Sequence, residues 1–576
     1  MKFINELALL LFCIISITFL IRERKKSVNK EKRGSLEKIE LTRRENEETK
    51  IDSFVRQHSK WLWAVLLILI FISRIYQFGK LPAYVGVDEA AAAYDGYALA
   101  NFGVDRYLQS FPVYLTNFGG GQSVLYAYLS AGFMKILGTD LWVFRLPSLL
   151  LFILSILVGY QLVKKAKSEK MAFLFAFLLV IFPWHIMSSR YGLDCNLLFS
   201  MLIIDLYWLT CAKTLKGYIL AGVMIGLTLY TYCLSYLIIP IFLIGYLGYA
   251  LYLKKIQIKQ ILVLGIPIFL LALPLMTMLL VNNGILEPMQ WGPFTITKLL
   301  EYRQNEIAIS NIWNHGIETI LRIFTSENIL YAVEIPFFII GILVAVKETI
   351  ISIKEKKWSL DAVMLIVFIA VLFTMLLVEG VNSNKANAIY IPIIYYAASG
   401  ILALCKKSMW LLIIAIGVFI MLFVNYMVYY YMQIAQYARS PYESRDLYEI
   451  AIWIEQEEQF KNANKYIITK DLSRPEIYFM LAQKVSPYVF AQTKQVQDYP
   501  LEGGNQMQML QSYEKHYFDM NQEAFEQLEK GNQEMIFIID QYYELLISLL
   551  QKKGLNTVQK RKFYDFISIK KRGNFK

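Results

Sequence analysis

"WLWAVLLILIFISRIYQFG" (61–79) is an apolar run that leads into "LPAYVGVDEAAAAYDGYALANFG" (81–103), which carries two adjacent acids, Asp88 and Glu89. A transmembrane helix needs about 20 mostly apolar residues, and the first stretch is of this kind. Similar runs recur along most of the chain, and 56% of all residues are hydrophobic. The sequence therefore predicts a polytopic α-helical membrane protein with two acids just beyond a membrane exit.

The apolar runs divide the chain into three parts. We expect an N-terminal helix with a charged cytoplasmic linker at 1–60, a membrane domain at 61–431 and a small α/β domain at 432–576. The first apolar run lacks the small-residue cleavage site of a signal peptide, which favours a retained helix over that alternative. The predicted spans are 3–21, 61–79, 141–163, 171–188, 195–211, 217–235, 237–253, 259–281, 330–346, 360–379, 388–404 and 409–431.

The terminal part changes in composition. "YEIAIWIEQEEQF" (448–460) has helical spacing, and "YYELLISLLQKKG" (542–554) is typical of a helix that ends at a glycine. "KYIITK" (465–470) and "EMIFIID" (534–540) indicate short strands, and "KFYDFISIKK" (562–571) alternates like a final strand. These segments predict a compact α/β domain after the last span.

The net charge of +12 does not indicate a nucleic-acid partner. The segment from residue 432 onward holds 19 basic and 19 acidic residues, so the excess lies in the membrane part and its connections. Cytoplasmic loops of membrane proteins are enriched in Lys and Arg, and this rule accounts for the excess. We expect a lipid bilayer as partner and no nucleic acid.

The same rule orients the chain. If the 22–60 linker is cytoplasmic, the short basic connections fall inside, and the long external loops contain few cations. This arrangement requires "SVLYAYLSAGFMKILG" (123–138), which is short for a crossing, to be an interfacial helix. Asp88, Glu89 and the terminal domain are then outside the cytoplasm. We expect a multi-pass protein of a bacterial plasma membrane.

Polar residues gather at this predicted outer face, and each has an alternative structural role. Asp88 could cap a helix that starts at Glu89, because a short acid is a common N-cap. Arg190 could snorkel and pair with the nearby Asp194, or these two could bind a phosphate or a sugar. Lys385 could belong to an ordinary Asn-rich turn. Candidate cations for a phosphate are Arg190, Arg303 and Lys385.

Five stretches together resemble the glycosyltransferase family 39 group, which includes protein O-mannosyltransferases and lipid A aminoarabinose transferases of the GT-C fold. The resemblance covers about 61–431, and the order and spacing of the stretches carry it. They are "VDEAAAAYDGYALANFGVD" (87–105), "FGGGQSVLYAYLSAGFMKILGTDLWVFRLPSLL" (118–150), "FPWHIMSSRYGLD" (182–194), "LTLYTYCLSYLIIPIFL" (227–243) and the Asn-rich turn before "IYIPIIYYAASGI" (389–401).

The resemblance implies a GT-C glycosyltransferase that uses a polyprenyl-phosphate-linked sugar. The sugar would pass with inversion to an acceptor hydroxyl on a protein, a cell-wall polymer or a glycolipid. Asp88 matches the family's base, and Glu89 would orient it or bind the acceptor. Arg190 and Asp194 match a family element that binds substrate, and Lys385 stands where members often carry Arg.

The leaving phosphate needs its charge neutralised more than it needs a proton. Arg190, Arg303 and Lys385, or a divalent metal ion, could supply this. Some relatives bind a metal and others do not, and the sequence contains no ligand cluster that decides between them. The main alternative from another class is a transporter or flippase of lipid-linked sugars, which would favour ionisable residues at mid-membrane.

Overall fold

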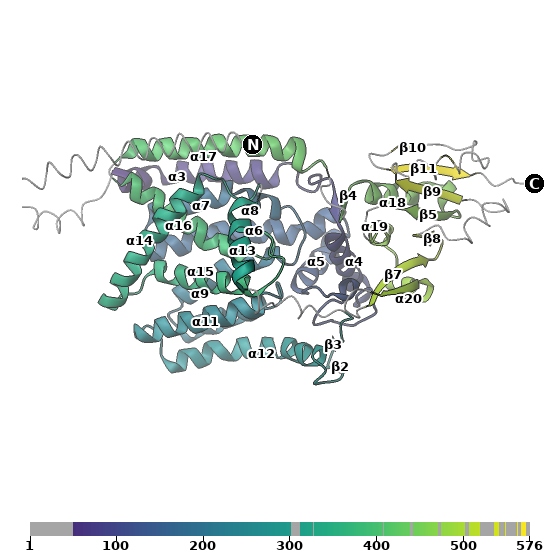
Figure 1. The fold of residues 1–576 in the computed structure, drawn as a ribbon, viewed down its shortest axis with the longest axis horizontal. Helices are drawn as coiled ribbons and strands as arrows, with labels where there is room; N and C mark the ends of the chain where they lie inside the picture. Colours follow the sequence, from purple (N-terminus) through teal and green to yellow (C-terminus); the bar gives the residue numbers. More distant parts are fainter. Residues whose placement is uncertain are drawn as a thin grey trace, which may run out of the picture.

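The computed structural model describes residues 50–300, 312–326, 328–406, 408–437, 442–469, 474–500, 506–518, 535–540, 548, 561–562 and 566–571. The predicted span at 3–21, Arg303 and nearly all of the predicted helix at 542–554 lie outside these residues. In the described part, a bundle of long helices occupies one end of the molecule and a sheet domain the other (Figure 1).

Eight helices among the described residues are long and apolar enough to cross a membrane. They run side by side in the bundle (Figure 1) and agree with eight of the predicted spans. The eight are α3 (Lys50–Ile70) with the π-helical turn Phe71–Ile75, α6 (Leu141–Ala166), α11 (Ser235–Tyr252), α12 (Ile258–Asn282), α14 (Glu334–Glu355), α15 (Leu360–Leu377), α16 (Tyr390–Cys405) with the 3-10 turn Asn387–Ile389, and α17 (Met409–Tyr429) with the π-helical turn Tyr430–Ile434.

The three other predicted spans within the described residues, 171–188, 195–211 and 217–235, form shorter helices. The predicted span 171–188 is wrong as one continuous helix, because it breaks at Phe182, whose backbone is extended (ψ 118°). Pro183 follows, and the residue before a proline is disfavoured in helical conformation. The shorter helices are α7 (Glu169–Ile181), α8 (Pro183–Ser188), α9 (Asn196–Cys211) and α10 (Leu215–Thr228).

Two helices separate the bundle from the sheet domain (Figure 1). They are α4 (Val87–Phe102) and α5 (Leu125–Leu137), which pack on each other. Helix α5 has 13 residues, which is short for a crossing. Helix α10, at the predicted span 217–235, has only 14 residues, so the non-crossing position of 123–138 stays a prediction. Helix α13 (Ile312–Thr325) and the hairpin of β2 (Met289–Trp291) and β3 (Phe294–Ile296) lie between α12 and α14 in sequence.

The terminal domain is built on a seven-stranded mixed sheet of order β10-β11-β9-β5-β8-β7-β6. Central β5 runs parallel to β8 and β9, and the other pairs are antiparallel. The strands predicted at 465–470, 534–540 and 562–571 are confirmed as β5, β9 and β11, and the helix predicted at 448–460 as α18. The strands are β5 (Asn464–Ile468), β6 (Gln495–Pro500), β7 (Gln506–Tyr513), β8 (His516–Tyr517), β9 (Met535–Asp540), β10 (Arg561–Lys562) and β11 (Phe566–Lys571), and the helices are α18 (Asp446–Gln456), α19 (Glu476–Ala482) and α20 (Pro487–Thr493).

The sheet domain and α4 share one hydrophobic core. Strand β1 (Val85–Gly86) pairs with β4 (Glu443–Ser444) across the junction. The Tyr94 hydroxyl donates to the Val485 carbonyl at 2.9 Å, and the Tyr97 hydroxyl donates to the Lys484 carbonyl at 2.6 Å. The terminal domain is therefore packed directly on the helix that carries Asp88 and Glu89.

One aromatic ring joins the first loop to the terminal domain. Phe118 lies between two guanidinium groups, with Arg106 5.0 Å and Arg474 4.9 Å from the ring centroid. Arg106 forms a buried bidentate ion pair with Asp95 of α4, with a shortest distance of 2.7 Å. Arg474 lies 3.8 Å from the carboxylate of Glu476 at the start of α19. Such cation–π contacts stabilise by about 0.5–2 kcal/mol each.

Candidate active site

Helix α4 begins where the chain passes from β1 into the first loop. Its N-cap is Gly86, and no side chain caps it. A Cβ atom on Gly86 would lie 1.9 Å from the Tyr191 hydroxyl, so a larger residue here would have to displace the Tyr191 side chain. The capping role considered for Asp88 is wrong, because the helix starts at Val87 and both acids belong to its first turn. Negative charge in this turn is stabilised by the helix dipole.

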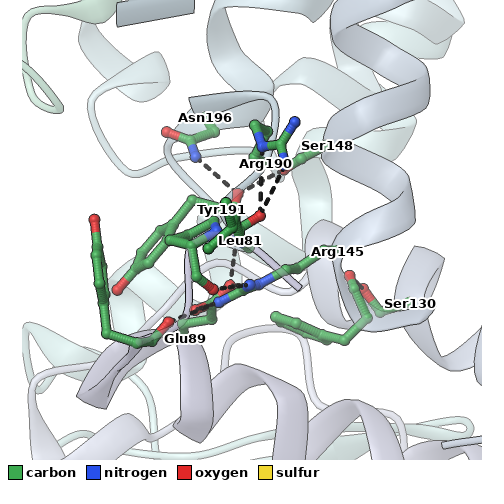
Figure 2. A network of polar contacts seen from close by, with 12 residues as sticks. Leu81, Glu89, Ser130, Arg145, Ser148, Arg190, Tyr191 and Asn196 are labelled. Atoms are coloured by element: carbon green, nitrogen blue, oxygen red, sulfur yellow. Dashed lines mark hydrogen bonds and ion pairs between the residues drawn. The ribbon is translucent and has the colours of Figure 1, made fainter. Parts of the chain in front are cut away.

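The two adjacent acids face different surroundings. Asp88 is exposed, whereas the Glu89 side chain has 0% exposure. Glu89 forms a bidentate ion pair with Arg145 of α6, with Nε–Oε1 and Nη2–Oε2 distances of 2.8 Å (Figure 2). The backbone N–H of Gly192 donates to the same carboxylate at 2.7 Å. Glu89 therefore anchors the first turn of α4 and leaves Asp88 to face solvent.

Arg145 also binds the chain that enters α4. Its remaining donors reach the carbonyl of Pro82 at 2.9 Å and that of Tyr84 at 3.0 Å. One buried guanidinium thus connects α6, the 81–85 segment and Glu89. Glu89 was predicted to orient Asp88 or to bind the acceptor. Its carboxylate lines neither of the cavities described below, and the orienting role stays a prediction.

Arg190 lies apart from the cavities and is fully buried. It donates to the carbonyls of Arg74 at 3.0 Å, Tyr76 at 2.9 Å and Leu81 at 3.2 Å (Figure 2 shows the Leu81 contact). These carbonyls stand at the end of the π-helical turn after α3 and in the segment that follows it, where helical hydrogen bonding stops. The snorkelling alternative is wrong, because the Arg190 side chain is buried within the protein. Its contacts with backbone carbonyls indicate a structural role instead of a contact with phosphate.

A cavity of about 500 Å³ opens beside Asp88. Its wall comes from the first loop, the ends of α9, α11 and α12, and the turn before α16. It combines polar groups with the apolar side chains expected of a site for a lipid-linked molecule. The lining residues are Asp88, Tyr114, Asn117, Gly120, Gly121, Gln122, Leu193, Asp194, Cys195, Tyr232, Cys233, Leu234, Tyr236, Leu237, Met278, Leu279, Asn283, Leu299, Val378, Asn382, Asn384 and Lys385.

A second cavity of about 230 Å³ adjoins the first. The two share Asp88, Leu193 and Asn384 in their walls. The smaller one reaches towards the terminal domain, because Tyr442 and Glu443 line it. Asp88 is thus a carboxylate that two adjoining spaces have in common.

Asp194, which was predicted to bind substrate, lines the larger cavity. Its role in binding stays a prediction. Its carboxylate accepts the backbone N–H of Ser123 at 3.0 Å and that of Cys195 at 2.8 Å. Burial raises the pKa of Asp194 to about 6, and the two N–H groups oppose this shift. The group is therefore mostly ionised at neutral pH and is held by the backbone, with no ion pair to Arg190 among the described contacts.

Lys385 is the only cation among the described residues that line the larger cavity. Its Nζ donates to the Glu379 carbonyl at 3.0 Å. Its backbone N–H and that of Asn384 donate to the Asn382 side chain, at 2.9 and 3.0 Å, which fixes the turn. Of the predicted site residues, the structure thus brings together Asp88, Asp194 and Lys385.

The sequence interpretation missed two residues next to the acids. The Asn117 amide donates to the Asp88 carboxylate at 3.3 Å, and no spacing rule links the two across the first loop. Arg145 could have been found from the sequence, because a charge inside the predicted span 141–163 is costly in a membrane and therefore indicates a buried partner. No group of three or more His, Cys, Asp or Glu side chains that could hold a metal occurs in the described ranges.

Residues 122–278 match the family described as dolichyl-phosphate-mannose-protein mannosyltransferase. No curated protein shows significant sequence similarity to the chain. Among solved structures, apo ArnT from Cupriavidus metallidurans superposes with a TM-score of 0.51 at 11% identity, covering 90% of this chain and 98% of ArnT. ArnT bound to undecaprenyl phosphate gives 0.53 at 10% identity, with the same coverage. The predicted resemblance is confirmed, and the chain is a multi-pass membrane protein of the GT-C glycosyltransferase fold.

Proposed function

We propose that this protein transfers a sugar from a polyprenyl-phosphate donor to an acceptor hydroxyl, with inversion, at the extracytoplasmic face of the membrane. The observation that carries the proposal is Asp88, an exposed carboxylate on a helix N-terminus that lines two adjoining cavities. The fold is that of ArnT, which has been solved with undecaprenyl phosphate. The matched family is described by a dolichyl-phosphate-mannose donor.

The larger cavity is the proposed donor site. Lys385 supplies positive charge in its wall, and Leu237, Met278 and Leu279 supply apolar surface. A phosphate joined to an isoprenoid chain needs both. The smaller cavity is the proposed acceptor site, because the terminal domain contributes to its wall through Tyr442 and Glu443. The acceptor is a protein, a cell-wall polymer or a glycolipid.

In the proposed reaction the acceptor oxygen attacks the anomeric carbon while Asp88 removes the hydroxyl proton. A new carbon–oxygen bond forms as the bond from the same carbon to the phosphate oxygen breaks. The electron pair stays on the lipid phosphate, whose charge Lys385 neutralises. We assign no step to a divalent metal, although Asp88 and Asp194 would be available to a metal-dependent relative of this mechanism.

The test uses the full chain in liposomes with a panel of radiolabelled sugars on isoprenoid phosphates. The wild type should release the lipid phosphate and label an acceptor mixture, and Asp88→Asn should reduce the rate by at least 100-fold, within the range of general-base contributions. Asp140→Asn, at an exposed acid outside both cavities, is the matched control. Undiminished turnover in Asp88→Asn would reject the base, and movement of intact donor without cleavage would support the transporter alternative.

A further inference from the structure

Three buried side chains of the first loop hold a polar atom that has no hydrogen-bond partner in the described part of the chain. They are Asn117 (6% exposed, Oδ1), Gln122 (5% exposed, Oε1) and Ser123 (2% exposed, Oγ). Asn117 and Gln122 also line the larger cavity. Leaving one such atom unsatisfied costs about 1–3 kcal/mol, and native proteins rarely tolerate a group of them. The wall is therefore arranged for a ligand.

The orientation of the two amides shows which kind of ligand fits. The Asn117 nitrogen donates to Asp88 at 3.3 Å, and the Gln122 side chain hydrogen-bonds the Asp194 carboxylate. A carboxylate accepts and an amide nitrogen donates. Each amide therefore donates one N–H to an acid, and both carbonyl oxygens remain as acceptors without a described partner.

The loop that carries these amides is already fixed without a ligand. Leu115 and Gln122 exchange two backbone hydrogen bonds of 2.9 Å, and the N–H groups of Gly119 and Gly121 both donate to the Thr116 carbonyl at 3.0 Å. Asn117 itself has a positive φ of 29°, a conformation that asparagine tolerates better than most residues. The two oxygens are thus held in place before binding, which lowers the entropic cost of recognition.

The surrounding charges exclude an anion from this wall. Asp88 and Asp194 accept from the two amides, so two carboxylates and two unpartnered carbonyl oxygens make this region rich in acceptors. Lys385, the described cation of the cavity, belongs to the turn before α16. A ligand with several donors on one rigid frame suits the acceptor wall, whereas a phosphate suits the Lys385 turn. A sugar on a phosphate has both parts.

We propose that the Asn117 and Gln122 carbonyl oxygens accept hydrogen bonds from hydroxyls of the sugar that is transferred, and so determine which sugar is used. This inference rests on the proposed function and deepens it, because it names the residues that recognise the hexose. Asp88 would then receive the acceptor proton beside a sugar ring whose orientation is set by these two oxygens.

The experiment compares donors that differ by one hydroxyl. The parent is the hexose that the wild type transfers fastest from mannosyl, glucosyl and galactosyl isoprenoid phosphates, and each analogue lacks one hydroxyl. One lost hydrogen bond should lower kcat/KM about 10-fold in the wild type. In Gln122→Met the ratio of parent to one particular analogue should fall to about 1. In Asn117→Ala the ratio for a different analogue should fall in the same way.

The ratio separates recognition from damage, because a misfolded or misaligned site would slow the parent and every analogue together. Gln109→Met is the control. This substitution removes the 3.2 Å hydrogen bond from Gln109 to Thr116 in the same loop. Residue 109 does not line the cavity, so all ratios of parent to analogue should stay as in the wild type. Ratios unchanged in both amide variants would overturn the inference while wild-type turnover still supports the proposed function.

Two further outcomes also decide. Transfer by the wild type from an amino-sugar donor alone would overturn the hydroxyl assignment, because an ammonium would then be the group bound. Absence of transfer from every isoprenoid-phosphate sugar would reject the proposed function and the inference with it.

Discussion

The ion pair between Glu89 and Arg145 makes the sharpest prediction for the fold. Both side chains are at most 1% exposed, and the carboxylate accepts three hydrogen bonds of 2.7–2.8 Å. Replacing Glu89 by Gln keeps the shape and removes the charge. Arg145 would then keep only neutral partners in a buried position: the carbonyls of Pro82 and Tyr84 and one amide oxygen of the new side chain.

The expected cost is large for one substitution. Removing one partner of a buried ion pair costs about 3–5 kcal/mol, because the other charge stays desolvated. We therefore expect Glu89→Gln to lower the free energy of unfolding by this amount. Arg145→Gln should have a similar effect, and the double variant should lose less than the sum of the two, because it leaves no uncompensated charge.

The assay is unfolding in mixed micelles with increasing SDS, followed by tryptophan fluorescence. A matched control is Glu169→Gln, which breaks the ion pair of Glu169 with Lys164, whose side chains are 31% and 42% exposed. An exposed pair stabilises by about 0–1 kcal/mol. A Glu89→Gln protein as stable as the Glu169→Gln protein would refute the structural role given to Glu89.

Three other predictions concern the cavity. Burial raises the pKa of the Asp194 carboxyl from 3.8 to about 6. The protonated group therefore stabilises the fold fully below pH 3.8, and this stabilisation of about 3 kcal/mol is lost as the pH rises through 6. Asp194→Asn should remove this difference between the free energies of unfolding measured at pH 4 and at pH 7. Gly121→Ala should reduce transfer, because its φ is +83° and the new Cβ would meet the Tyr114 ring, whereas Gly138→Ala (φ +94°, open space) bears only the backbone strain and should transfer normally once folded. Lys385→Ala should raise the KM for the donor about 10-fold or more with little change for the acceptor, and an unchanged donor KM would remove it from the phosphate site.

Most of the bundle could be predicted because the bilayer imposes a minimum length on apolar runs. The exception at 171–188 was marked by Pro183, which breaks the span into α7 and α8. The start of α4 was predicted at Glu89 because Asp88 is a residue type that often caps helices, whereas the helix starts at Val87. Gly86 is extended (φ −83°, ψ 156°) and pairs with Glu443 of β4 immediately before the actual boundary. Local pattern carries no trace of this pairing with a strand far along the chain.

The predicted site residues also fall into those that sequence pattern could place and those that it could not. Asp88, Asp194 and Lys385 line one cavity, because the connections that carry them meet at the same end of the bundle. Arg190 could not be assigned from its own neighbours, since its partners are the carbonyls of a segment around residues 74–81. Arg145 shows that a charge within an apolar run is the most informative signal that the pattern offered.

The ring of Phe118, held by Arg106 from the first loop and Arg474 from the last domain, bears on how such enzymes can be recombined. Exchanging the terminal domain for one from a distant relative would preserve every span and yet release one side of the loop that carries Asn117. We expect a chimaera that brings an arginine to that place to keep the loop better fixed than one that does not. The two halves of this protein are therefore expected to change together in evolution, although each has its own fold.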